Sequence, residues 1–445
     1  MKIENDFSGL KEVQLTHGEK GHFLHVLQAF SPDNKWLVYD TRNDETHISR
    51  TSTIEMVNTN SKEVVTLYNT QNQTFYGPGV GGVSFNPKKH QVIFIHGLQN
   101  CSSEKPYGFS RRTGVSIKTD SPQKPILLDA RDITKPYTPG ALRGGTHAHS
   151  WSRDGQWITF TYNDYIMSTL AENADSGVKD LRMVGIMAPL GPVKVDKDAA
   201  GENNDGEMYS IVVSVVFENP ALGSDQIDRA YCDAWIGENG YRKSNGEQQK
   251  RAIAFLGDTR DPKGNKLTEV FVIDIPKEIS KANDGEFIEG TDKARPMPPA
   301  GTIQRRLTYT KDRKYPGVQG PFHFVKSLPD GSMIFFLMKD GSGIVQVYAA
   351  NTTKGDITQI TNNKLSIETS FDLSPEGKFL AYGIHEDIWI TEIANGITQI
   401  VSSKSDLNAT DLGSINWSND GKSLAYKRKV IEKDTGYFEI FILRL

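Results

Sequence analysis

Two histidines two residues apart, His147 and His149, are the side chains whose type and spacing most clearly suggest chemistry. On an extended strand both would point to the same face. Two imidazoles on one face can share a divalent metal, or one can bind while the other transfers a proton. The preceding Gly144 and Gly145 would let the backbone approach a ligand closely. The alternative is that each imidazole only satisfies a neighbouring carbonyl, and local spacing supplies no third metal ligand.

Other candidates surround this pair in the sequence. Tyr137 and Arg143 precede it in the segment PYTPGALRGGTHAH (136–149). His96, in FIHG, and His323, in GPFHF, lie on or just before strand patterns, and these strands could bring both histidines to the same central channel of the fold. Each of these two histidines alone is also explained by a structural role.

The segment ALGSDQIDRAYCDAWIG (221–237) could form a short helix after a Ser or Asp cap. Arg229, Tyr231 and Trp235 would then partly share one face and could bind a substrate, with a guanidinium for a carboxylate and rings for a sugar. Packing on the rim of the fold is the alternative. Two arginine pairs, 111–112 and 305–306, supply further positive charge, but neighbouring strand residues face opposite ways, so only one of each pair could serve a given site.

A short repeated phrase shows which elements must position these residues. An aromatic or apolar residue ends one strand, a Ser/Pro/Asp/Gly turn reverses the chain, and an alternating apolar strand follows. The copies are FSPDNKWLVYD (30–40), FNPKKHQVIFIHG (85–97), WSRDGQWITFTYND (151–164), LPDGSMIFFL (328–337), LSPEGKFLAY (373–382) and WSNDGKSLAY (417–426). The last two begin about 44 residues apart, which is the period of a four-stranded propeller blade.

The sequence therefore predicts an all-β fold, a seven-bladed β-propeller over residues 1–445 as a single domain. Strand ends of the LT or IT type (13–17, 305–310, 358–361 and 398–401) precede the hairpins. The C-terminal strand lacks such a partner, so the N-terminal strand is expected to complete the last blade. Segments 207–217 and 251–275 are assigned to one blade, with insertions near 218–250 and 276–303. Two blades there would make eight.

Composition excludes some functions. The 445 residues have a net charge of −4, which gives no global reason to expect nucleic acid or an anionic membrane as partner. The two cysteines, Cys101 and Cys232, have no metal-like spacing. The first residues do not form a secretory signal, and no run of about 18 apolar residues occurs. The chain as written suits the cytoplasm, whereas a removed signal peptide would mean the periplasm, so the compartment stays open.

Several stretches closely resemble the YidR-like family, an uncharacterised bacterial group of TolB-like β-propellers. They include PYTPGALRGGTHAH, FTYND, DLRMVGIMAPLGPV (180–193), AFLGD (254–258), QRRLTYT (304–310) and GIVQVY (343–348), and the resemblance spans nearly the whole chain. It implies the propeller fold but carries no catalytic residue with it, because this family has no settled activity.

The segment HAHSWSRDGQWITFTYND (147–164) is also similar to part of the oligogalacturonate lyases, which are seven-bladed propellers that hold a divalent metal with histidines and cleave uronate polymers by β-elimination. Ulvan lyases are related propellers that use His, Tyr and Arg. By this likeness His147 and His149 would bind one divalent metal, Mn²⁺, Ca²⁺ or Zn²⁺, with no organic cofactor. The lyases have a Gln before the pair, and Arg143 and Gly144 stand there instead.

These observations lead to two hypotheses. The first is a polysaccharide lyase acting on an anionic, uronate-containing glycan, with the metal or Arg143 neutralising the carboxylate, a neutral histidine as base, and Tyr137 or a second histidine as acid. The catalytic candidates are His147, His149, His96, Tyr137 and Arg143, and the substrate-binding candidates are Arg229, Tyr231, Trp235 and His323. The second is a non-catalytic module that binds a protein or a glycan, since propellers host both.

Overall fold

The computed structural model describes residues 10–402 and 409–445, and strands dominate its secondary structure. The described part has one α-helix, α1 (Tyr165–Ala171), and two 3-10 turns (Ile48–Arg50 and Ala174–Ser176). Helix α1 begins after Asp164, whose carboxylate accepts a hydrogen bond from the Met167 N–H at 2.9 Å. The all-β prediction is confirmed.

Five sheets in the described part have four strands each. The first contains β2 (Phe23–Leu24), β3 (Trp36–Asp40), β4 (Thr53–Asn58) and β5 (Val64–Asn69). The second contains β6 (Val80–Phe85), β7 (Gln91–Gly97), β8 (Arg112–Lys118) and β9 (Ile126–Leu127). The third contains β20 (Lys326–Ser327), β21 (Met333–Lys339), β22 (Val345–Asn351) and β23 (Ile357–Gln359). The fourth contains β24 (Asp372–Leu373), β25 (Phe379–Ile384), β26 (Asp387–Glu392) and β27 (Thr398–Ser402).

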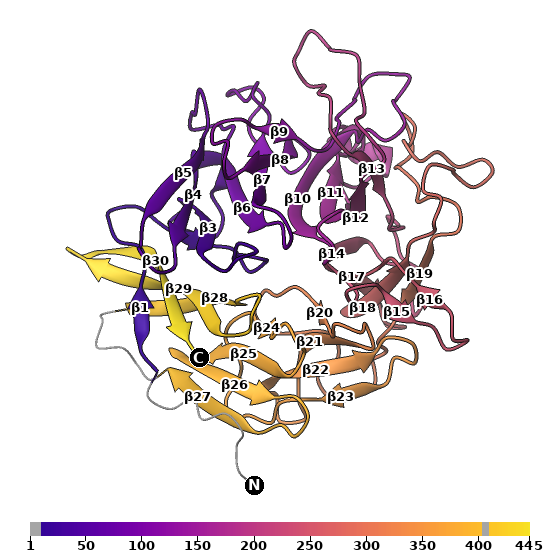
Figure 1. Cartoon of the computed structure of the whole chain (residues 1–445). Helices are drawn as coiled ribbons and strands as arrows, with labels where there is room; N and C mark the ends of the chain where they lie inside the picture. Colours follow the sequence, from indigo (N-terminus) through magenta and orange to yellow (C-terminus); the bar gives the residue numbers. More distant parts are fainter. Residues whose placement is uncertain (1–9, 403–408) are drawn as a thin grey trace.

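The fifth sheet joins the two ends of the described chain. It contains β28 (Ala409–Trp417), β29 (Ser423–Glu432), β30 (Thr435–Arg444) and, on its edge, β1 (Glu12–Gln14). Strand β1 runs antiparallel to β30, with Val13 opposite Ile442. Figure 1 shows this pairing, the indigo β1 beside the yellow β30, and the sheets placed one after another around the centre of the molecule.

A larger, eight-stranded sheet covers the middle of the chain. It contains β10 (Gly144–Trp151), β11 (Ile158–Asp164), β12 (Arg182–Ala188), β13 (Tyr209–Val212), β14 (Arg229–Trp235), β17 (Ala252–Arg260), β18 (Lys266–Asp274) and β19 (Ile303–Arg306). A single parallel bridge, Arg182 to Arg229, joins its two groups of four strands. A small hairpin, β15 (Tyr241–Arg242) and β16 (Gln248–Gln249), stands beside this sheet.

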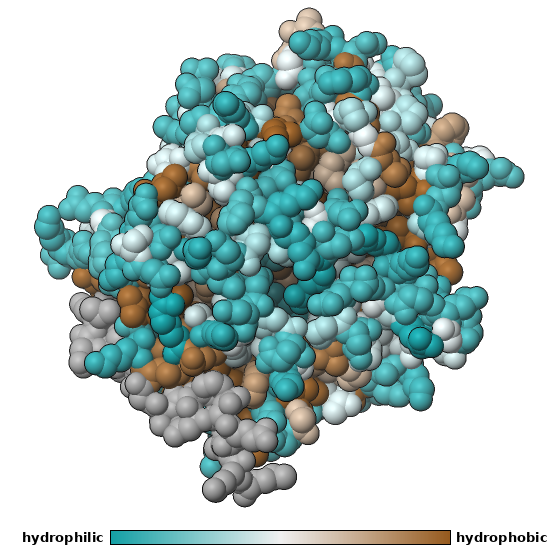
Figure 2. Space-filling view, in the orientation of Figure 1, coloured by the Kyte–Doolittle hydropathy of each residue, from teal (hydrophilic) through white to brown (hydrophobic). Residues whose placement is uncertain are grey.

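The core lies between neighbouring sheets, because each strand presents one face to the sheet before it and one to the sheet after it. For example, Val38 and Leu67 of the first sheet form one buried cluster with Phe85 and Phe94 of the second. The surface seen in Figure 2 is mainly hydrophilic, with hydrophobic residues in small areas.

Two expectations for the middle of the chain are wrong. Segment 207–217 does not share strands with 251–275, since its strand β13 pairs with β12 of the preceding group. Segment 221–237 is not helical, since it contains strand β14, which pairs with β17. Both errors have one cause. A short apolar segment fits both the helical and the strand repeat of hydrophobic residues. Which strand it pairs with depends on which face of the neighbouring elements is left uncovered.

Candidate functional site

A cavity of about 780 Å³ is lined by residues of β2, β6, β10, β12 and β28 and of the loops before β8 and β20. Its volume is in the range of pockets that hold small molecules. Of the predicted site residues, all of which the structure describes, His147 is the one that lines it. The cavity also contains arginine, aromatic and acidic side chains that the sequence did not single out as a site.

Strand β10 does not keep the side-chain alternation predicted from the sequence. His147 and Ser150 are three residues apart, but their partners on β11 are two apart, so β10 contains a β-bulge. Ala148 at the bulge has φ +55°, a left-handed conformation. A bulge re-aims the side chains around it. The prediction that His147 and His149 share one face is wrong: His147 lines the cavity, and His149 is buried against Gly114 of β8.

His149 belongs to a buried polar chain. Thr146 Oγ1 donates its hydrogen to Asp129 Oδ2 at 3.0 Å, so the 3.0 Å contact between His149 Nε2 and the same oxygen requires Nε2 to be the donor. Burial, together with the charge of Arg112, lowers the pKa of His149 to about 3. His149 is therefore a neutral side chain that fixes the start of β10.

Three arginines gather beside His147, and each is the first residue of its strand: Arg112 of β8, Arg182 of β12 and Arg229 of β14. Arg112 and Arg182 line the cavity, and the parallel bridge places Arg229 next to Arg182. No carboxylate among the described residues forms an ion pair with any of the three, whereas Arg143 and Arg306 are paired with Asp164 and Glu269. We call Arg112, Arg182 and Arg229 the arginine cluster.

The arginine cluster carries positive charge without local compensation. Nε and Nη2 of Arg112 are buried and have no hydrogen-bond partner among the described residues. Burial and the charges of Arg229 and Arg112 lower the pKa of Arg182 to about 10, so it is still charged at neutral pH. Buried like charges are unfavourable unless a counter-charge is present. Guanidinium groups form their strongest hydrogen bonds with carboxylates and phosphates. The cluster is therefore suited to an anionic ligand.

Phe109 packs against this cluster. Its ring centroid lies 4.8 Å from Arg112 Cζ and 5.2 Å from Arg182 Cζ, and the His147 ring stacks on it with centroids 6.4 Å apart. The electron-rich ring face stabilises both cations, which limits their mutual repulsion. Phe109 thus holds two guanidinium groups and one imidazole at the same wall of the cavity.

The charge state of His147 follows from this surrounding. Burial, and next the charges of Arg112 and Arg182, hold the pKa of His147 well below its usual value. Its Nδ1 is buried without a hydrogen-bond partner in the described part of the chain. At neutral pH the imidazole is therefore uncharged and can accept a proton. Tyr107 lines the same cavity, and its hydroxyl oxygen accepts a hydrogen bond from Arg112 Nη1 at 3.0 Å, which leaves the hydroxyl hydrogen free to donate.

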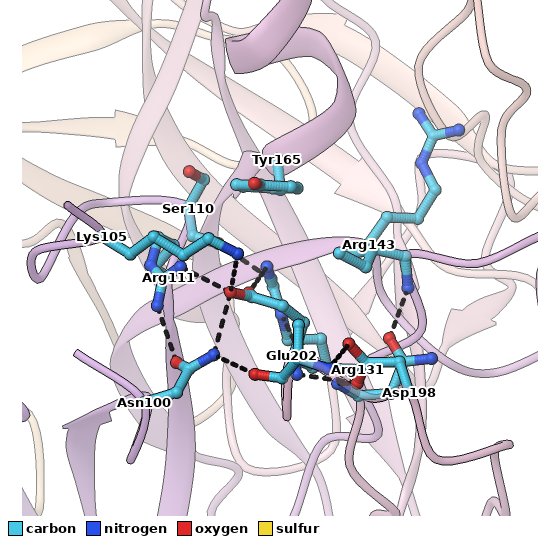
Figure 3. A network of polar contacts seen from close by, with 12 residues as sticks. Asn100, Lys105, Ser110, Arg111, Arg131, Arg143, Tyr165, Asp198 and Glu202 are labelled. Atoms are coloured by element: carbon cyan, nitrogen blue, oxygen red, sulfur yellow. Dashed lines mark hydrogen bonds and ion pairs between the residues drawn. The ribbon is translucent and has the colours of Figure 1, made fainter. Parts of the chain in front are cut away.

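Two nearby arginines, in contrast, do have a carboxylate partner. Arg111 and Arg131 surround the buried carboxylate of Glu202, with Arg111 Nη1 2.6 Å and Arg131 Nη2 3.3 Å from its oxygens (Figure 3). Asn100 donates to the same carboxylate at 3.0 Å. This network ties the segment around residue 202 to the second sheet. Of Arg111 and Arg112, Arg112 alone lines the cavity, and Arg111 points to the Glu202 network instead.

His96 and His323 lie outside the cavity lining. His96 Nε2 lies 3.0 Å from the Tyr68 hydroxyl, and His96 Nδ1 contacts the carbonyl of Gly97. His323 Nε2 accepts from the Leu337 N–H at 3.1 Å, so Nδ1 donates to the Pro321 carbonyl at 2.8 Å. Burial lowers the pKa of His96 and lowers that of His323 to about 4.

The three candidate residues of β14 lie in different surroundings. The Arg229 guanidinium lies 4.5 Å from the ring of Tyr231, whose hydroxyl donates to Asp258 at 3.1 Å. A bulge follows Tyr231. Trp235 instead lines a separate pocket of about 120 Å³, where its Nε1–H donates to the Ser150 carbonyl at 3.0 Å. Arg229 is thus the member of this set that adjoins His147.

Arg143 and Tyr137 form a structural contact away from the cavity. The Arg143 guanidinium pairs with Asp164, with Nε at 3.0 Å and Nη2 at 2.9 Å from Oδ2. It also donates to the backbone carbonyls of Thr291 and Ala294, and lies 4.9 Å from the Tyr137 ring. Arg143 therefore fastens the 276–302 segment to the beginning of β10.

We expect Arg143→Met to lower the free energy of unfolding by about 3–5 kcal/mol, because it leaves the Asp164 carboxylate buried and unpaired. Urea unfolding followed by tryptophan fluorescence measures this, with Arg153→Met, a change at an exposed arginine, as control. Unchanged stability together with lost ligand binding would instead place Arg143 in the site.

The predicted metal pair is separated in the structure. His147 and His149 face different environments, and His149 Nε2 already contacts Thr146. Within residues 10–402 and 409–445, no group of three or more His, Cys, Asp or Glu side chains is arranged to hold a metal ion. The side chains present do not fit a metal centre. The positive charge that could neutralise an anionic ligand at this wall comes from arginine.

Sequence reasoning missed most of the cavity. Tyr107, Phe109 and Arg182 were not predicted, and neither was His25, which lines the cavity and whose pKa burial lowers to about 3. Arg182 lies in DLRMVGIMAPLGPV, a stretch noted only for its resemblance to a family. The signal in the sequence that could have identified Arg182 was its position as the first residue of an expected strand.

A family model described as a protein of unknown function (DUF3748) matches residues 79–203, which include Arg112, His147 and Arg182. The uncharacterized protein YidR of Escherichia coli (strain K12) is 36% identical over 416 residues, covering 93% of this chain and 94% of the relative. The chain belongs to the YidR family. The resemblance seen in the sequence is thereby confirmed.

Solved structures extend the comparison of this YidR family member to its fold. An oligogalacturonate lyase in complex with manganese is similar with a TM-score of 0.55 and 11% identity, covering 98% of this chain and 93% of that one. An oligogalacturonate lyase from Vibrio parahaemolyticus gives 0.50 and 10%, covering 98% and 94%. These neighbours are propellers and support that fold. No helix in the described residues is long and apolar enough to cross a membrane.

Proposed function

We propose that this YidR family member is a polysaccharide lyase that cleaves a uronate-containing anionic glycan by β-elimination in the 780 Å³ cavity. The observation that carries the proposal is an uncharged imidazole, His147, beside three arginines without a carboxylate partner among the described residues. The oligogalacturonate lyase neighbours support the same reaction class by fold alone.

The chemistry assigns a role to each group. The arginine cluster binds the uronate carboxylate and neutralises its charge, so the C5 proton becomes more acidic. His147 takes that proton, and the C5–H electron pair forms the C4=C5 double bond. The C4–O bond breaks, and Tyr107 donates its hydroxyl proton to the leaving oxygen. His147 was already among the candidate bases inferred from the sequence, and Tyr107 replaces Tyr137 and the second histidine as the acid.

The proposed fold is a seven-bladed propeller whose central channel opens at this cavity. The five four-stranded sheets are five blades, and the eight-stranded sheet is two more, joined only by the bridge between Arg182 and Arg229. Strand β1 closes the ring by completing the blade of β28–β30. The arrangement of the sheets around one centre in Figure 1 supports this proposal.

The proposal does not depend on a divalent metal. The lyase in complex with manganese suggests that Mn²⁺ belongs in the test, although the donor set of this chain does not fit a metal centre. The reaction is therefore assayed with added Mn²⁺, Ca²⁺ or Zn²⁺ and with a chelator. Each condition is compared with the untreated protein.

The experiment is incubation with a panel of uronate polymers while the ultraviolet absorbance of the unsaturated product is followed. We expect absorbance to rise with at least one polymer, because elimination creates a double bond conjugated with the carboxylate. No rise under any metal condition would reject the lyase. Calorimetric binding of the same polymers without product would instead support a non-catalytic glycan-binding module, and binding of neither would leave a protein partner as the remaining alternative.

A further inference from the structure

The charges around the cavity are divided between two walls. Arg112, Arg182 and His147 form one wall, built from β8, β12 and β10, and Arg229 of β14 lies next to Arg182 behind it. Two carboxylates line the other: Glu368, in the segment before β24, and Asp411, in β28. We call these two residues the acidic wall. A ligand that spans the cavity must therefore place its anionic group at one wall only.

The carboxylates of the acidic wall are exposed and have only distant cationic partners. The side chain of Glu368 is 49% exposed and lies 3.5 Å from His385, and that of Asp411 is 60% exposed and lies 4.0 Å from Lys429. Exposed ion pairs of this kind contribute little to the stability of the fold, so a ligand can replace the partner at small cost. Both carboxylates are therefore accessible to a ligand.

The remaining charged residues of the lining already have close partners. Arg42 forms two hydrogen bonds with Asp40, at 2.7 Å and 2.9 Å, and both side chains are buried. Lys427 pairs with Glu45 at 3.3 Å and lies over the rings of Phe23 and Phe438. These pairs add no free positive charge on the side of the acidic wall.

An aromatic surface borders the acidic wall. Phe322 lines the cavity with 64% of the residue exposed, and it contacts the buried Phe324 edge to face, with ring centroids 5.4 Å apart. His323 between them is fixed by hydrogen bonds to Leu337 N–H and the Pro321 carbonyl. This segment presents an apolar ring next to carboxylate acceptors, which suits the apolar face and the hydroxyl donors of an uncharged sugar.

We propose that the cavity takes a glycan segment in which one uronate is followed by an uncharged sugar, and that it discriminates against contiguous polyuronates. The uronate binds at the arginine cluster, and the uncharged sugar lies on Phe322 with its hydroxyl groups donating to Glu368 and Asp411. A second uronate at that position would set its carboxylate against both carboxylates of the acidic wall. This inference rests on the proposed function for its reaction, but its recognition step can be measured separately.

The test compares two oligosaccharides of equal length, one of contiguous uronates and one alternating uronate with an uncharged sugar. We expect the wild type to favour the alternating one by about tenfold in kcat/KM and in Kd, since like charges placed together disfavour binding. Kd is measured calorimetrically in His147→Gln where cleavage interferes, and in the wild type where it does not. The double variant Glu368→Gln/Asp411→Asn should gain affinity for the contiguous oligosaccharide and lose most of the preference.

The controls separate specificity from folding and from catalysis. Asn tolerates a left-handed backbone, so it is compatible with the φ of +53° at position 411. Glu376→Gln alters an exposed carboxylate of the same sheet region outside the cavity and should leave the preference unchanged. Equal or tighter binding of the contiguous oligosaccharide, or an unchanged preference in the double variant, would overturn the inference. A binding preference without any cleavage would reject the lyase and keep the inference.

Discussion

His147→Gln is expected to lower kcat/KM for the uronate glycan by about 10²–10⁴-fold, because it removes the base that takes the C5 proton. The free energy of unfolding should stay nearly unchanged, because the side chain is only partly buried and its Nδ1 has no hydrogen-bond partner among the described residues. Unsaturated-product absorbance and urea unfolding measure the two effects. His90→Gln, at an exposed histidine, serves as control.

The pH dependence of the wild type checks the same role. A base must be unprotonated, and burial with the charges of Arg112 and Arg182 holds the pKa of His147 well below its usual value. As pH falls, kcat/KM should therefore persist through the range near 6.5 where an ordinary histidine is protonated, and be lost only at lower pH. An acid limb centred near 6.5, or an unfolded His147→Gln variant, would argue against this role.

Arg182→Gln is expected to raise Kd and KM for the uronate glycan roughly 30-fold or more, which corresponds to about 2 kcal/mol, the lower range for removing one partner of a desolvated charge pair. The free energy of unfolding should not fall, because no described carboxylate loses a partner and repulsion with Arg112 and Arg229 is relieved. Arg143→Met, in contrast, is expected to lower the free energy of unfolding. Calorimetry gives Kd, and urea unfolding gives stability.

Arg153→Gln is the matched control for Arg182→Gln, since Arg153 is exposed and lines the separate, smaller pocket. It should change neither Kd nor unfolding. Unchanged affinity in Arg182→Gln would show that the arginine cluster does not bind the ligand. A loss of stability there would mean that the cluster has a structural role.

The sequence predicted strands well where the hairpin phrase is clear. The copies at 373–382 and 417–426 both fall on hairpins, at β24–β25 and β28–β29, because a turn between alternating segments has only one local solution. The middle was less predictable. Strand β13 joined β12 and segment 221–237 contained a strand, since pairing partners there depend on uncovered neighbouring faces.

The site was predictable only in part. The unusual spacing of two histidines directed attention to His147, which lines the cavity. The spacing could not reveal the bulge at Ala148, which turns His149 into the core. It also could not separate Arg143, which is paired with Asp164, from Arg182, which has no such partner among the described residues.

The sequence by itself determined an all-β chain of repeated hairpins, its membership of a family, and one histidine of the candidate site. The tertiary structure decided which charged groups meet. Arg112, Arg182 and Arg229 are at least 47 residues apart along the chain, and they come together only because two of them begin strands at the same cavity and the third begins the strand bridged to Arg182. Local spacing specifies turns and strand faces within a few residues, whereas a cluster built from three strands depends on sheet packing, which acts between residues distant in sequence.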